Sequence, residues 1–268
     1  MPNYICITCG TQFPDTVSPP EHCPICDDER QYVGWKGQQW TTLEQMRATH
    51  RNTFRDEEPN LVGIGAEPSF AIGQRALLIR APGGNVLWDC ITFIDEATVE
   101  AVRALGKVSA IAISHPHFYS GMVEWAHALD APIYLHARNR EWVMRPDPSI
   151  VFWEGETHAL GEGLTLIRCG GHFEGSTVLH WAAGAEGRGA LLTGDTLYVV
   201  SDRRYVSFMR SFPNLIPLSP SAINGILKAI EPFPYDRIYS SWFERVVTAD
   251  AKAAVARSAE RYLRVIAE

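Results

Sequence analysis

Two histidines stand one residue apart in residues 114–121, whose sequence is Ser-His-Pro-His-Phe-Tyr-Ser-Gly. The apolar run of residues 108–113 comes directly before them and predicts a buried strand. Two imidazoles placed where a strand passes into a loop can both turn toward one point beyond the end of that strand. Neutral imidazole is a ligand of zinc and of other first-row metals. His115 and His117 therefore predict one part of a metal site.

Four of the six cysteines form a second constellation near the N-terminus. Cys6 and Cys9 make one Cys-x-x-Cys pair, Cys23 and Cys26 make another, and 13 residues separate the two pairs. Each pair can offer two thiolates to one ion, so together they fit a tetrahedral site of four cysteines. The segment has too few apolar residues for a core of its own, and a metal would supply the missing folding energy. The alternative is a pair of disulfides, which suits an oxidising compartment.

Length, charge and composition argue against several classes of protein. A chain of 268 residues can bury a large core in one domain and still carry a small module. The formal net charge of −7 and the isoelectric point near 5.7 argue against nucleic acid or an anionic membrane as a partner. No apolar run approaches the roughly 20 residues that span a bilayer, and the first residues do not have the pattern of a secretory signal. We therefore expect a cytoplasmic protein that acts on a small molecule, and a homo-oligomer is left open.

The pattern along the chain predicts a small N-terminal module, residues 1–36, and a larger α/β domain, residues 37–268. Trp35 and Trp40 lie near this boundary and are expected to pin the module to the larger domain. Apolar runs alternate with amphipathic stretches across the larger domain. The expected strands are residues 75–80, 85–89, 108–113, 131–135, 150–153, 164–168, 177–181, 190–193 and 237–240. The expected helices are residues 41–50, 95–105, 121–129, 137–144, 220–230 and 249–267.

The cysteine module resembles zinc ribbons and rubredoxin, in which the two pairs also take the forms Cys-x-x-Cys-Gly and Cys-Pro-x-Cys. The gap between the pairs is shorter here than is usual in rubredoxin. The resemblance therefore implies one zinc ion with a structural role, and iron is the alternative. The implied ligands are Cys6, Cys9, Cys23 and Cys26.

The larger domain resembles the metallo-β-lactamase superfamily over roughly residues 60–245. The strand followed by His115, His117 and a glycine is similar to the start of the family's His-x-His-x-Asp-His signature. Residues 169–176 resemble the loop that supplies a third histidine, here His172. Residues 191–197 resemble the strand end that supplies an aspartate, here Asp195, and residues 85–90 resemble an early strand that ends in an aspartate. The resemblance implies a four-layer αββα sandwich, preceded here by the cysteine module.

Three ligand positions of the family's second metal site hold other residues in this chain. Tyr119 stands for the aspartate of the signature, Ser120 stands for its last histidine, and no histidine follows His180. The second metal site is therefore not expected to form in the usual way. The residues implied as ligands of one remaining ion are His115, His117, His172 and Asp195.

Four residues beside these ligands have roles that the sequence leaves open or only suggests. Tyr119 and Ser120 either hydrogen-bond a metal-bound water or a substrate oxyanion, or only fill the space of the lost site. Glu174 is a base, a hydrogen-bond acceptor behind the metal ligands, or a solvated loop carboxylate. Asp89 is expected to orient the loops of the site, and the two cysteines outside the module are expected to be inert buried thiols.

The leading hypothesis is a mononuclear zinc hydrolase that activates water against an ester, thioester, lactone or amide-type substrate. Asp195 would complete the metal shell or orient the nucleophile, and Tyr119 would stabilise developing charge. Phosphodiesters are less favoured, because two metals usually share the charge of their transition state. One alternative is a mononuclear iron oxidoreductase, similar to the persulfide dioxygenases of this superfamily. The other is a non-catalytic metal-binding protein.

Overall fold

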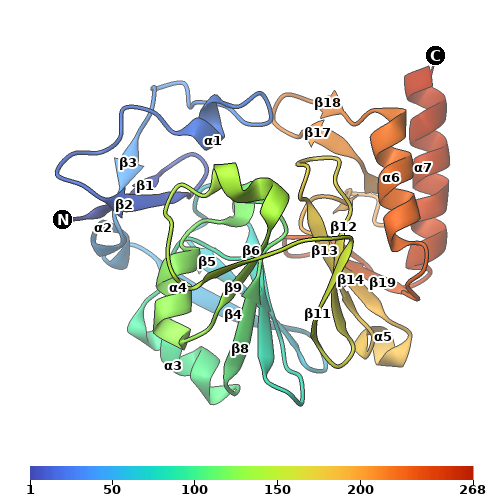
Figure 1. Cartoon of the computed structure of the whole chain (residues 1–268), viewed down its shortest axis with the longest axis horizontal. Coiled ribbons are helices and arrows are strands. Elements are labelled where there is room, and N and C mark those ends of the chain that lie inside the picture. The colour runs from blue at the N-terminus through green and yellow to red at the C-terminus, as the bar shows by residue number, and fades with distance from the viewer. Residues whose placement is uncertain (268) are drawn as a thin grey trace. The chain divides into compact units, whose positions relative to one another are not determined.

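The computed structural model describes residues 1–267, and the chain divides into two compact units (Figure 1). The first unit consists of Met1–Leu135 and Arg140–Phe152, and the second of His136–Asn139 and the chain from Trp153 onward. Each unit has its own β-sheet and its own helices. Within residues 1–267, no helix combines the length and the apolar composition needed to cross a membrane.

The first unit begins with the cysteine module. Strand β1 (Asn3–Cys6) pairs antiparallel with β2 (Gln12–Asp15) and β3 (Trp40–Thr41), and the short helix α1 (Pro24–Asp27) lies between β2 and β3 in the chain. Trp40 packs edge-on against Phe13, with 5.1 Å between ring centres. Trp142 and Met144, from outside the module, pack on the same cluster of buried cysteines. Trp35 is fully exposed, so the expected anchoring role holds for Trp40 and is wrong for Trp35.

The connector leads into helix α2 (Leu43–Arg47), which is shorter than the helix expected over residues 41–50. Thr42 caps this helix, because its hydroxyl accepts a hydrogen bond from Gln45 N at 3.3 Å. The chain then enters strand β4 (Arg51–Glu58), which pairs with β5 (Leu61–Glu67). The sequence pattern did not predict β4, since most of its side chains are polar and exposed and give no apolar run.

Strands β4 and β5 form one edge of a seven-stranded sheet with the order β10-β9-β8-β7-β6-β5-β4. The other strands are β6 (Arg75–Ile79), β7 (Asn85–Trp88), β8 (Val108–Ala112), β9 (Ile133–His136) and β10 (Ile150–Trp153). β7, β8 and β9 run parallel, because helices α3 (Glu96–Ala104) and α4 (Met122–Leu129) carry the chain back between them. The carboxyl ends of β7 and β8 therefore meet at one edge of the sheet, and candidate site residues follow both ends.

Two short 3-10 helices flank this part of the sheet: η1 (Pro116–Phe118) follows β8, and η2 (Ala137–Trp142) follows β9. η2 replaces the α-helix expected over residues 137–144. Arg138 N donates to His136 Nδ1 at 3.2 Å, and Asn139 Oδ1 accepts from Gly175 N at 2.9 Å. The first contact is local and the second is tertiary, and apolar periodicity reveals neither.

The second unit is built on a six-stranded sheet with the order β11-β12-β13-β14-β19-β20. Neighbouring strands are antiparallel except β14 and β19, which are parallel. The strands are β11 (Thr157–Gly161), β12 (Leu164–Arg168), β13 (Thr177–Trp181), β14 (Ala190–Leu192), β19 (Arg237–Tyr239) and β20 (Val246–Val247). The short helix α5 (Gly184–Gly187) joins β13 to β14. Two strand pairs precede β19: β15 (Tyr198–Val199) with β16 (Val206–Ser207), and β17 (Met209–Ser211) with β18 (Ile216–Pro217).

Helices α6 (Pro220–Ile230) and α7 (Ala251–Ala267) lie side by side against this sheet (Figure 1). α6 begins at Ser219, whose hydroxyl accepts a hydrogen bond from Ala222 N at 3.3 Å. Its apolar face enters the core between the helices and the sheet through Ile223, Ile226 and Ile230. Both units combine β-strands with helices, and the chain is of the α/β class with a small cysteine module at its start.

Candidate metal centres

The four cysteines of the module form one compact, buried cluster. Their sulfur atoms all lie within 4.8 Å of one another, and the Cys6–Cys26 and Cys9–Cys23 sulfur pairs are each 3.6 Å apart. No disulfide joins them. Four thiolates around one zinc ion at about 2.3 Å would stand about 3.8 Å apart, so the cluster fits a tetrahedral metal site. The disulfide alternative is therefore wrong.

Local backbone structure places each cysteine of this cluster. Cys6 ends β1, and Gly10 N donates back to Cys6 O at 2.8 Å with Gly10 at φ +81°, which closes the first turn. Cys23 precedes α1, and Cys26 N donates to Cys23 O at 2.9 Å. Gln38 Nε2 also donates to Cys6 Sγ at 3.2 Å. Hydrogen bonds among the four thiols lower the pKa of Cys6 and raise the pKa values of Cys9 and Cys26.

The module packs directly on the loop that carries His115 and His117. Gln12 N donates to Ser120 O at 3.2 Å, and Thr92 Oγ1 donates to Gly10 O at 3.0 Å. A Cβ on Gly10 would come within 2.4 Å of Thr92 Oγ1, so only glycine fits here without a shift. Ser120 also accepts a hydrogen bond at its hydroxyl from Gln74 Nε2 at 2.9 Å. Ser120 therefore belongs to the junction between module and sheet, a role that the sequence alone did not indicate.

His115 and His117 lie just beyond the carboxyl end of β8, and both are buried. Asp89, which follows β7, accepts a hydrogen bond from Ser114 N at 2.8 Å and so has the loop-orienting role expected for it. Ser114 Oγ lies 3.1 Å from His115 Nδ1. Because Nδ1 is engaged there, Nε2 is the atom through which His115 would bind a metal. The two imidazole ring centres are 5.2 Å apart, and Phe118 packs edge-on against His115.

Gly121 lets this loop approach the neighbouring chain closely. A Cβ at Gly121 would lie 2.6 Å from the backbone oxygen of Thr92. The residue has an ordinary φ of −92°, so close approach, and not a left-handed backbone, is what requires glycine. Tyr119 stands before it in the same loop and is buried.

His172 lies in the second unit, in the loop between β12 and β13. Gly170 and Gly171 precede it at φ +67° and +83°, conformations that favour glycine and turn the chain sharply. His172 Nδ1 lies 3.1 Å from Met209 O, and the ring packs edge-on against Phe173. A carbonyl partner fixes the proton on Nδ1, so Nε2 is again the atom suited to a metal.

Asp195 follows β14 in the same unit and is buried. Gly194 before it has φ +58°, and Ser240 Oγ donates to Gly194 O at 3.1 Å. Thr193 Oγ1 donates to Leu197 O at 2.8 Å and closes the turn around the aspartate. Ser240 comes from the strand end where the family resemblance would place a late histidine. It holds the aspartate loop instead, a role that the sequence did not reveal.

The two histidines of the first unit and the histidine and aspartate of the second are four buried residues that each offer one ligand atom. Imidazole nitrogens and carboxylate oxygens are both ligands of metal ions in proteins. Three imidazoles and one carboxylate are a donor set that suits zinc and other first-row metals.

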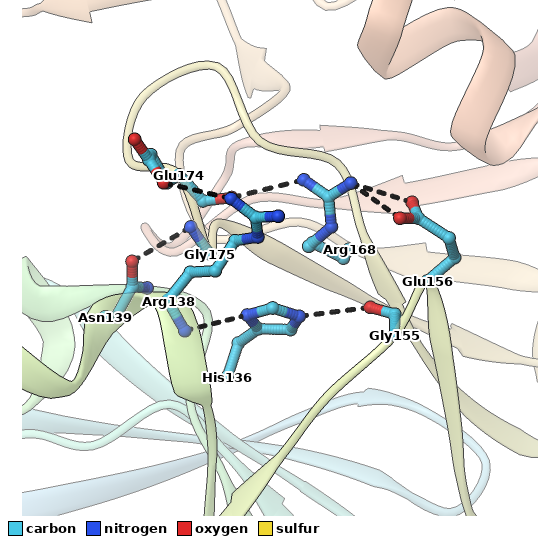
Figure 2. Close-up of polar contacts among 8 residues, drawn as sticks. All are labelled: His136, Arg138, Asn139, Gly155, Glu156, Arg168, Glu174 and Gly175. Atoms are coloured by element: carbon cyan, nitrogen blue, oxygen red, sulfur yellow. Dashed lines mark hydrogen bonds and ion pairs between the residues drawn. The ribbon is translucent and has the colours of Figure 1, made fainter.

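Three further residues that the sequence singled out, Cys90, Cys169 and Glu174, have surroundings that favour no catalytic role. Burial raises the pKa of the Cys90 thiol and raises that of Cys169 to about 12, so both stay protonated at neutral pH, as expected for inert thiols. Glu174 is mostly exposed, and its carboxylate pairs with Arg138 at 3.2 Å (Figure 2). This contact agrees with the solvated alternative.

Comparisons with known proteins support the expected fold. Residues 71–242 match the model of the metallo-beta-lactamase superfamily. The chain is 52% identical over 268 residues to YmaE of Bacillus subtilis (strain 168), described as an uncharacterized protein, with 99% of this chain and 97% of YmaE covered.

Solved structures of metallo-beta-lactamases also resemble this chain in fold. The crystal structure of VMB-1 superposes with a TM-score of 0.61 at 14% identity, covering 81% of this chain and 99% of VMB-1. FIM-1 from Pseudomonas aeruginosa gives a TM-score of 0.57 at 12% identity, covering 78% of this chain and 95% of FIM-1. At these identities the likeness concerns the fold. The family model and the fold agree, and the chain belongs to the metallo-beta-lactamase superfamily.

Proposed function

We propose that this protein is a hydrolase that works with a single metal ion, zinc being the best match to the donor set. Membership of the superfamily supports a metal-dependent hydrolase in general terms. The narrower proposal rests on three buried imidazoles and one buried carboxylate, together with Tyr119 and Ser120 at positions where the family has further ligands. The proposed ligands are His115, His117, His172 and Asp195.

A zinc ion at such a site lowers the pKa of water to about 7 and polarises a carbonyl oxygen. The chain's own contribution is to orient its ligands. Asp89 holds the backbone at Ser114, the Ser114 hydroxyl engages Nδ1 of His115, and Met209 O engages Nδ1 of His172. Both rings are thereby turned to use Nε2, and the protein does not need to reorganise when the ion is present.

We further propose that Asp195 and Tyr119 act on the reacting atoms. Asp195 offers a buried carboxylate, which can complete the shell of ligands and accept a hydrogen bond from the attacking water. Tyr119 replaces a ligand of the family signature and offers a phenol, which can donate a hydrogen bond to the oxygen of a substrate where negative charge develops. Neither role needs a second ion.

The substrate class follows from this arrangement. A single ion and a phenol donor suit one developing oxyanion, as in the hydrolysis of a small ester, thioester, lactone or amide. Phosphodiesters fit less well, because two metals usually share the charge of their transition state. The fold itself is compatible with one ion, since FIM-1 was crystallised in a mono-zinc form.

The test is a panel of small esters, thioesters, lactones and amides, assayed with the purified protein and with His117→Ala. Loss of the ligand should lower hydrolysis by a factor of about 100 or more and remove one ion from the chain. His22→Ala is the matched control, because His22 is an exposed histidine in the cysteine module. Hydrolysis at the wild-type level in His117→Ala would contradict the proposal.

The role of Tyr119 has its own test. Tyr119→Phe should keep the metal and lower the turnover number by a factor of about 10 to 1,000, the range seen when one oxyanion donor is lost. An unchanged turnover number would assign Tyr119 to packing alone. Stoichiometric iron with oxygen uptake in the wild-type protein would favour the oxidoreductase alternative over hydrolysis.

A further inference from the structure

The second unit contains a cleft of about 890 Å³ beside the loop that leads to His172. Helix α6 forms one wall, and Gly170 and Gly171 contribute to another. Its apolar surface includes Ile167, Cys169 and Phe233. The volume lies within the range of about 300–1,000 Å³ that is typical of small-molecule sites.

Charged side chains line the same cleft, and most of them are paired. Figure 2 shows Arg138 beside Glu174, at 3.2 Å, and Arg168 Nη2 bonded to both carboxylate oxygens of Glu156, at 2.7 and 2.9 Å. Lys228 is the remaining charged residue of the lining, and among residues 1–267 it has no ion-pair partner. The cleft therefore has one positive charge in excess, and two arginines fixed in place beside it.

Gly225 keeps this cleft open. It lies in the interior of α6, where glycine is less favourable than alanine. A Cβ at this position would meet no atom within 4 Å. Packing within the unit therefore gives no reason for glycine, whereas a larger side chain here would project into the cleft.

We propose that this cleft binds a small amphipathic anion, an organic acid with an aromatic or acyl body and one negatively charged group. The body would pack on Ile167, Cys169 and Phe233, and the charged group would pair with Lys228 at the wall formed by α6. An apolar surface with one uncompensated cation favours such an acid over a neutral compound of the same shape. The inference stands whether or not the proposed hydrolytic activity is found, because none of the residues that carry it is a proposed metal ligand.

The test compares two fluorescent probes with closely similar ring systems. 1-Anilinonaphthalene-8-sulfonate carries one negative charge, and N-phenyl-1-naphthylamine lacks it. The sulfonate should bind the metal-loaded protein saturably with one site per chain, and the neutral probe about tenfold more weakly or worse. Equal affinities for the two probes would overturn the proposal, since the cleft would then be apolar without selecting an anion.

Two substitutions test whether the probe binds in this cleft. Gly225→Phe should fill the cleft and weaken sulfonate binding by about tenfold or more, whereas Asn224→Phe, exposed on the same helix but outside the lining, should leave it unchanged. Lys228→Gln changes only an exposed side chain and should also weaken binding, with Lys107→Gln as its control. Unchanged binding in Lys228→Gln, or equal effects of a substitution and its control, would show that the probe binds elsewhere and would overturn the proposal.

Discussion

Asp89 ties the end of one strand to the loop that carries the paired histidines. It is buried, its carboxylate accepts from Ser114 N at 2.8 Å, and its backbone has φ +58°. Asp89→Ala leaves a buried N–H without this acceptor, and we expect the free energy of unfolding to fall by about 1–3 kcal/mol. Asp89→Asn keeps an oxygen acceptor and tolerates the left-handed backbone, so it should retain most of the stability. Urea unfolding measures both, and equal losses would argue against the positioning role.

Gly121 is a second position at which one added atom, the Cβ of alanine, is expected to lower the stability of the protein. The added Cβ of Gly121→Ala would stand 2.6 Å from Thr92 O and must displace backbone. We expect a loss of about 1–3 kcal/mol in the free energy of unfolding, together with weaker metal binding, since the same loop carries the histidines. Gly83→Ala is the control, because a Cβ there meets nothing within 4 Å. Thermal melts and metal titrations of both variants give the comparison; a neutral Gly121→Ala would refute the close-approach argument.

Among individual residues, the sequence identified those that belong to a short motif of neighbouring residues. The His-x-His spacing and the glycines before His172 both lie within a few residues of the side chains they serve. The role of Ser240 was not predicted, because its hydrogen-bond partner, Gly194 O, is 46 residues away in the chain. The role of Ser120 was not predicted either, because its hydrogen-bond partners, Gln12 and Gln74, come close to it only when the chain folds.

Among the elements, the segment around His136 contacts the turn before β11, within the second unit. His136 Nδ1 accepts from Arg138 N, and Nε2 lies 3.1 Å from Gly155 O, so the neutral ring with its proton on Nε2 satisfies both contacts (Figure 2). Burial lowers the pKa of His136. The unfolded chain therefore binds a proton more readily, and this contribution to stability is present above about pH 6.5 and is lost as the pH falls below it.

The corresponding measurement is the urea midpoint between about pH 7.5 and about pH 5.5. The wild-type midpoint should fall over this interval, and His136→Gln should show a smaller fall. His22→Gln, at an exposed histidine, should keep the wild-type slope. Identical slopes in wild type and His136→Gln would contradict the assignment of a neutral, buried ring.

Most elements with an apolar period were predictable, although the buried strand β5 was not among the expected strands. The strands β6 to β9 and the helices α3, α4, α6 and α7 lie close to their expected ranges. β4 was missed because it is a polar, exposed strand at a sheet edge. The α-helix expected over residues 137–144 was wrong, because the contacts of η2 with His136 and with the distant Gly175 leave no trace in the apolar pattern.

For the whole molecule, the family resemblance predicted more of the fold than hydrophobic periodicity did. Pattern alone gave an alternation of strands and helices, whereas four short motifs in family order pointed to the superfamily that the comparisons then established. What neither revealed is that the cysteine module contacts the loop of His115 and His117 through Gln12, and the segment after β7 through Gly10. This contact couples the module to the candidate metal loop, because the first unit holds both.

The measurement that tests the account most directly is the metal content per chain, by mass spectrometry, of protein purified without added metal. We expect two zinc ions in the wild type, one in His117→Ala and one in Cys9→Ser, whereas Cys90→Ala, which alters a buried cysteine that is not a proposed metal ligand, should keep two. A wild-type protein with one ion that Cys9→Ser removes and His117→Ala retains would contradict the proposed hydrolytic centre.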